Sequence, residues 1–181
     1  MKDLYLCLDI SSTCTGYSFL DEDGNCHLVG CIRTGNRKKF STNYDIIDEI
    51  CRVLFEEVSN IDGNVVGIFS ESALKKFSRG RSSASTIAKL TSINFATRYE
   101  LYRKFGLTAV EIAPTAVKKL VGYKKKEDKK EKTLEFVIDR FPDFPIEYTR
   151  YGNTHQKCYD MADSIAIGWI GLETEKKEES K

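Results

Sequence analysis

Two apolar segments of this chain each end on a carboxylate, and this pairing constrains the fold more than any other feature. The run Leu4–Leu8 is followed by Asp9, and the run Val65–Ser70 is followed by Glu71. A carboxylate at the end of a buried strand is costly to desolvate unless a cation or a proton meets it. We therefore expect the two strands to lie side by side, with both acidic ends in one polar pocket.

A second acidic pair lies far along the chain, at the start of a helix of small apolar residues. Asp160 and Asp163 are three residues apart, so a helix places both carboxylates on one face. Two strand ends and such a pair can build an oxygen-rich pocket of the kind that hard divalent ions prefer. The pattern predicts metal-dependent phosphoryl chemistry.

Hydrophobic periodicity predicts the remaining elements of the chain. The expected strands are 4–10, 15–20, 26–34, 65–70 and 108–112, and the expected helices are 43–58, 82–105, 114–120, 133–141 and 158–172. This order predicts an α/β fold in which an antiparallel meander continues into parallel strands, giving a five-stranded mixed sheet with helices on both faces. Asp9 would then lie on the central strand and Glu71 on its parallel neighbour.

The expected organisation is one domain over residues 1–172, followed by a charged, disordered tail over 173–181. The lysine-rich segment 122–132 lacks an apolar period, so we expect an exposed loop there. No apolar run approaches the ~18 residues that span a bilayer, and no signal peptide is evident. We therefore expect a cytoplasmic protein with no membrane partner.

The six cysteines are scattered through the expected core elements, without a CxxC pair and with only two histidines in the chain. A structural zinc site needs clustered ligand pairs, so this pattern argues against one. It indicates free, mostly buried thiols in a reducing compartment.

The charge of the chain is strongly divided, although the net charge is only +1. Residues 72–132 contain 16 lysines and arginines against five acidic residues, a local charge of +11, which leaves −10 for the remainder. A basic segment of this size fits a polyanionic partner, and acidic flanks fit metal ligands.

Four segments, taken together and in order, resemble the RuvC-type Holliday junction resolvases. They are LDISSTCTGY at 8–17, FSE at 69–71, APTAVK at 113–118 and DMADSIA at 160–166. The resemblance implies a ribonuclease H-like fold and a homodimer that cuts four-way and other branched DNA with two Mg²⁺ ions per site. Mn²⁺ is expected to substitute, and no nucleotide cofactor is expected. The chain departs from bacterial members at Ile10-Ser11, where they have Pro-Gly, and this suggests a divergent viral, phage or organellar type.

The resemblance also assigns roles to residues. Asp9, Glu71, Asp160 and Asp163 match the catalytic, metal-binding acids, and Lys118 matches a catalytic basic residue at the DNA backbone. A second lysine at the scissile phosphate falls among Lys129, Lys130 and Lys132, and the sequence leaves that choice open. Leu74 occupies the usual position of an aromatic wedge, with Phe77 three residues further on. The full expected DNA-binding set is Leu74, Lys75, Lys76, Phe77, Arg79, Arg81, Lys118, Lys119, Lys124, Lys129, Lys130 and Lys132.

Two other functions share part of this sequence pattern. A non-catalytic binder of branched DNA would keep the basic segment but would not need four acids. An actin-like phosphotransferase has a phosphate loop similar to residues 9–16, but it needs a second phosphate motif that 181 residues do not supply. Taken singly, Glu71 could be a helix N-terminal carboxylate and Asp160 a helix N-cap.

Overall fold

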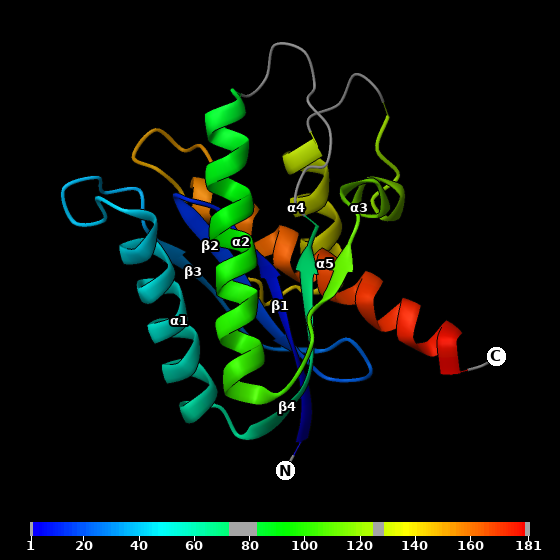
Figure 1. The fold of residues 1–181 in the computed structure, drawn as a ribbon. Coiled ribbons are helices and arrows are strands. Elements are labelled where there is room, and N and C mark those ends of the chain that lie inside the picture. The colour runs from blue at the N-terminus through cyan, green and yellow to red at the C-terminus, as the bar shows by residue number, and fades with distance from the viewer. Residues whose placement is uncertain (1, 73–82, 125–128, 180–181) are drawn as a thin grey trace.

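The computed structural model describes residues 2–72, 83–124 and 129–179 of the chain (Figure 1). The described residues form one sheet of five strands in the order β3-β2-β1-β4-β5. The strands are β1 (Lys2–Asp9), β2 (Cys14–Leu20), β3 (Cys26–Arg33), β4 (Gly63–Glu71) and β5 (Val110–Ile112). The helices are α1 (Asn43–Asn60), α2 (Ala84–Phe105), α3 (Pro114–Leu120), α4 (Lys129–Arg140) and α5 (Gln156–Glu179). The predicted mixed sheet is confirmed.

Side chains on the central strand alternate between two cores, one on each face of the sheet. Leu4, Leu6 and Leu8 of β1 pack with apolar residues of α1 and α2. Cys7, which points to the opposite face, belongs to a second cluster with β4 and α5. Figure 1 shows the same layers, with α1 and α2 on one side of the sheet and α3, α4 and α5 on the other.

The pairing of β1 with its two neighbours brings the acidic strand ends together. β1 runs parallel to β4 with Leu8 opposite Ser70, so the next residue of each strand is a carboxylate. β1 runs antiparallel to β2 with Asp9 opposite Gly16. A Cβ atom at Gly16 would overlap the backbone carbonyl of Asp160, so α5 packs against this edge at a distance that only glycine allows.

Several element boundaries differ from the prediction. α4 begins at Lys129, so residues 129–132 are helical and do not belong to a loop. α5 begins at Gln156, which places Asp160 inside the helix and excludes an N-cap role for it. α5 also continues through residues 173–179, where disorder was expected; these residues are good helix formers, and Lys177 lies 3.6 Å from Glu173. None of the described helices combines the length and the apolar character that a membrane span needs.

The expectation that every cysteine is a free thiol was wrong for one pair. Cys14 on β2 and Cys31 on β3 form a disulfide, with their Cα atoms 6.2 Å apart. The two residues are 17 positions apart in sequence, and the antiparallel pairing of β2 with β3 brings them together. The other four cysteines are free, and Cys7, Cys51 and Cys158 are buried.

Candidate active site

Four carboxylates gather where β1 and β4 end. Asp9 is the last residue of β1 and Glu71 the last of β4. Asp160 and Asp163 lie on one face of α5, which packs against β1 and β2. The charges of Asp163, Glu71 and Asp160 all act on the carboxyl group of Asp9. We call these four residues the acid cluster; the structure therefore brings together all four acids that the sequence singled out.

The carboxyl groups of the acid cluster are largely buried, where water solvates their charged form poorly. Burial raises the pKa of Asp9 well above its usual range, and the neighbouring acids raise it further. Burial also raises the pKa of Glu71 and of Asp163, although Lys129 opposes both shifts. Such a site favours a bound cation or a retained proton.

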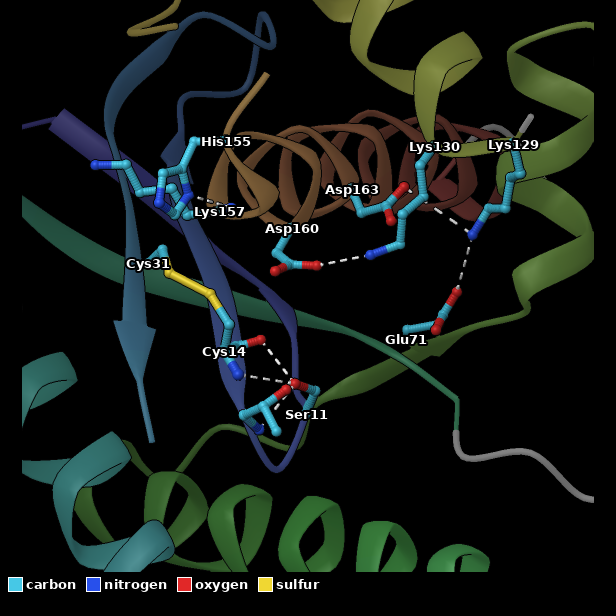
Figure 2. Close-up of polar contacts among 11 residues, drawn as sticks. Ser11, Cys14, Cys31, Glu71, Lys129, Lys130, His155, Lys157, Asp160 and Asp163 are labelled. Atoms are coloured by element: carbon cyan, nitrogen blue, oxygen red, sulfur yellow. Dashed lines mark hydrogen bonds and ion pairs between the residues drawn. A yellow bond between two sulfur atoms is a disulfide. The ribbon is translucent and has the colours of Figure 1, made fainter. Parts of the chain in front are cut away.

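Two lysines of the first turn of α4 supply positive charge to the cluster (Figure 2). The Nζ atom of Lys129 lies 3.8 Å from Oε1 of Glu71 and 4.0 Å from Oδ1 of Asp163. Lys130 donates a hydrogen bond of 3.0 Å to Oδ1 of Asp160. Lys132 pairs with Glu135 of its own helix at 3.1 Å. Of the three lysines that the sequence left open, Lys129 and Lys130 therefore contact the acids.

The expected basic surface is only partly described. The charge of Lys118 also opposes the raised pKa of Glu71. Its Nζ atom lies 5.6 Å from the centre of the Tyr123 ring. Lys119 and Lys124 are exposed. The remaining residues of the expected DNA-binding set lie outside the described residues: Leu74, Lys75, Lys76, Phe77, Arg79 and Arg81.

A cavity of about 190 Å³ opens between the ends of β1 and β4 and helix α2, and it includes two residues that sequence reasoning missed. Ser11 holds the turn after Asp9, because its hydroxyl donates to the carbonyl of Cys14 at 2.7 Å. Asn94 of α2 donates from Nδ2 to the carbonyl of Glu71 at 3.4 Å. The signal for Asn94 was a polar residue within the buried stripe of α2.

Two properties of the acid cluster suit a hard divalent cation: its oxygen ligands and a buried carboxylate oxygen that lacks a hydrogen bond among the described residues. All four side chains offer oxygen ligands, as Mg²⁺ and Mn²⁺ prefer. Oδ1 of Asp163 is buried and finds no hydrogen-bond partner among the described residues. Over residues 2–72, 83–124 and 129–179, however, no three His, Cys, Asp or Glu side chains are grouped closely enough to hold an ion. Lys129 and Lys130 lie among the carboxylates instead.

Comparison with known proteins places this arrangement on a known fold. No protein-family model matches the chain, and no curated protein sequence matches it. Among solved structures, RuvC of Thermus thermophilus has a TM-score of 0.64 at 13% identity, over 96% of each chain. RuvC of T. thermophilus in complex with a Holliday junction substrate has a TM-score of 0.59 at 12% identity, over 91% of this chain and 88% of that chain.

A third similar structure comes from a eukaryote. The yeast mitochondrial Holliday junction resolvase has a TM-score of 0.56 at 14% identity, over 96% of this chain and 82% of that chain. These three likenesses extend over nearly the whole chain. They confirm the RuvC-type fold that the four sequence segments indicated.

Proposed function

We propose that this chain, which has the fold of the RuvC-type resolvases, is a metal-dependent endonuclease that cuts four-way DNA junctions and related branched DNA. The observation that carries the proposal is the buried acid cluster at the ends of two parallel strands and on α5. Branched DNA is favoured as the substrate because a solved protein of this fold is bound to a Holliday junction.

In this proposal Asp9, Glu71, Asp160 and Asp163 would hold two Mg²⁺ ions, with Mn²⁺ as a substitute. Such ions activate the attacking water and neutralise the charge of the leaving oxygen in phosphodiester hydrolysis. Asp9 has the central place, since it lies between Gly16 of β2 and the end of β4 and is influenced by all three other acids. The absence of thiol and imidazole ligands from this set suits these ions over zinc.

The lysines beside the cluster would bind the phosphate that is cut. A phosphodiester carries a negative charge, and it would otherwise be repelled by four carboxylates. Lys129 and Lys130 approach the acids from α4, and the charge of Lys118 on α3 acts on Glu71. With the carboxylates holding metal, these ammonium groups would be available to oxygens of the DNA backbone.

We further infer a homodimer, because a four-way junction offers two symmetric cleavage sites and each chain has one acid cluster. A surface for the contact is the aromatic stripe of α2. Phe95, Tyr99 and Tyr102 are 63%, 52% and 51% exposed, and the rings of Phe95 and Tyr99 stack with centres 6.4 Å apart.

One assay tests the proposed function. Labelled four-way junctions and linear duplex are incubated with the wild-type protein and with Asp9→Asn, with and without Mg²⁺, and the cuts are mapped. We expect paired symmetric cuts in junctions that require the metal. Asp9→Asn should abolish cleavage but retain or strengthen binding, because the variant loses ligand charge and repels phosphate less.

Two results would contradict the proposal. Cleavage by Asp9→Asn at a rate near that of the wild type would show that the acid cluster does not take part in catalysis. Junction binding by the wild type without cleavage in either Mg²⁺ or Mn²⁺ would favour a non-catalytic binder of branched DNA.

A further inference from the structure

A second basic cluster flanks the acid cluster on the side away from α3 and α4. Arg33 is the last residue of β3, and His155 and Lys157 lie at the start of α5. Nη2 of Arg33 lies 2.9 Å from Nε2 and 3.0 Å from Nδ1 of His155. These three residues line a cavity of about 380 Å³, together with Thr13 and Asn36. We call Arg33, His155 and Lys157 the β3-side cluster.

This cluster lies at the same edge of the sheet as the acid cluster. β3 runs antiparallel to β2, and β2 antiparallel to β1, so Arg33 and Asp9 end their strands at the same edge. Lys157 precedes Asp160 by three residues on α5, close to one helical turn. In Figure 2, Lys157 and His155 lie on one side of Asp160, and Lys129 and Lys130 lie on the other.

Within the part of the chain that the structure describes, the ion pair that balances the β3-side cluster involves an exposed carboxylate. Lys157 pairs with Glu147, whose side chain is 57% exposed. Exposed ion pairs of this kind contribute little stability, so an incoming anion can replace the carboxylate at small cost. The loop between β3 and α1 continues beyond the cavity with Arg37 and Lys38, which are exposed and extend the positive surface. The first-turn amide groups of α5 add a partial positive charge.

We infer that the β3-side cluster binds a backbone phosphate of the DNA arm that leaves the acid cluster on this side. The inference rests on the proposed function, since it assumes that DNA lies across the acid cluster. Three residues of helix, a rise of about 4.5 Å, separate Lys157 from Asp160, and phosphates of one strand follow every ~3.4 Å along the DNA axis. The bound phosphate is therefore about one to three nucleotides from the cut. The arginine supplies paired N–H donors and the lysine a point charge.

The primary test is the salt dependence of junction binding in metal-free buffer. The double variant Arg33→Gln/Lys157→Gln is compared with the wild type and with Arg103→Gln/Lys104→Gln, which removes two exposed charges from the far end of α2. Each lost phosphate contact reduces the slope of log K against log salt by about 0.9. We expect the first double variant to bind more weakly with a slope flatter by about 0.9, and the control to match the wild type.

A variant that is expected to bind more tightly distinguishes loss of a phosphate contact from loss of folding. Glu147→Gln removes the carboxylate that competes with phosphate for Lys157. We expect this variant to bind the junction more tightly than the wild type, with the difference absent when Lys157→Gln is also present. A misfolded protein would not bind more tightly.

A substituted junction locates the contact. Neutral methylphosphonates are placed singly at each of the three phosphates on either side of the cut. We expect one position to weaken binding by the wild type while leaving the Arg33→Gln/Lys157→Gln variant unaffected. If the wild type binds junctions, and the variant has the same slope and the same methylphosphonate profile as the wild type, the inference is overturned while the proposed function stands. If the wild type fails to bind junctions at all, both fall.

Discussion

At the scale of single residues, the acid cluster destabilises the metal-free protein. Burial first, and then mutual repulsion, raise the pKa of Asp9 above its unfolded value, and the pKa values of Glu71 and Asp163 are also raised. A raised pKa means that the folded state binds protons more tightly than the unfolded state. The associated stability is present at low pH and is lost as pH rises through the folded pKa. Sites of this kind are kept for function at a cost in stability.

Asp9→Asn should therefore stabilise the metal-free protein at pH 7. The change removes a carboxyl group whose ionised form is disfavoured by burial and by the neighbouring acids, and a gain of 1 kcal/mol raises Tm by about 2–4 °C in a chain of this size. The gain should shrink as the pH is lowered towards the unfolded pKa, because Asp9 is then protonated in the unfolded state as well. Thermal unfolding in EDTA across pH measures both effects. Asp139→Asn, on the exposed face of α4, is the control. A lower Tm for Asp9→Asn at pH 7 would contradict this account.

Asp21 should show the opposite pH dependence. Burial alone would raise its pKa, but hydrogen bonds from His27 and Asn25 outweigh this and lower it to about 2. A carboxyl group with a lowered pKa stabilises the folded state at any pH above its pKa in the unfolded state, 3.8. That stabilisation is lost as the pH falls towards 2. Asp21→Asn should lower Tm at pH 6, with the difference vanishing near pH 2. Asp23→Asn in the same turn is the control, and a constant difference across pH would refute the assignment.

At the scale of elements, the first turn of α4 decides which lysines face the acids. Because the helix begins at Lys129, it directs Lys129 and Lys130 towards the cluster and lets Lys132 pair with Glu135 along its own surface. In a flexible loop all three would be equivalent. The helical conformation of this turn therefore gives the three lysines different partners, although their side chains are the same.

Lys129→Gln and Lys130→Gln should each slow junction cleavage by about 10–100-fold, because each variant loses a charge-assisted hydrogen bond to the phosphate that would be cut, worth about 1.5–3 kcal/mol. Lys132→Gln removes the same charge from the same turn and should cut at a rate near that of the wild type. Single-turnover cleavage at saturating protein separates this effect from binding. Equal loss in all three variants would show that only the total charge of the segment matters.

At the scale of the whole molecule, the proposed two-fold symmetric substrate calls for two copies of a chain that carries one acid cluster. The aromatic stripe of α2 is the surface to test, because it leaves three large rings exposed on one helix. Tyr99→Glu places a charge at its centre and should convert the dimer to monomers at micromolar concentration, as measured by sedimentation. The monomer should lose paired symmetric cuts.

Tyr44→Glu tests whether any exposed tyrosine has the same effect. Tyr44 lies on α1 and is 79% exposed, so the same change there should leave the dimer intact. A wild-type protein that stays monomeric while making paired cuts would contradict the dimer.

The sequence by itself determined the sheet order and the convergence of the acids. The apolar runs that end on Asp9 and Glu71 are joined by two meander strands and a crossover helix, and this order predicts a parallel pair whose carboxyl ends meet. The spacing of Asp160 and Asp163 dictates one helix face. The apolar runs and the spacing of the acids are local features of the sequence, and burial of the two runs in one sheet brings their acidic ends together.

Only the tertiary structure decided which distant side chains meet. Cys14 pairs with Cys31, Lys129 with Glu71, and Arg33 with His155. The start of α4 and the end of α5 were also undetermined, because charged residues carry no apolar period to mark a boundary. These contacts depend on strand register and on how helices dock against the sheet, which are set by packing of the whole core and leave no short-range pattern in the sequence.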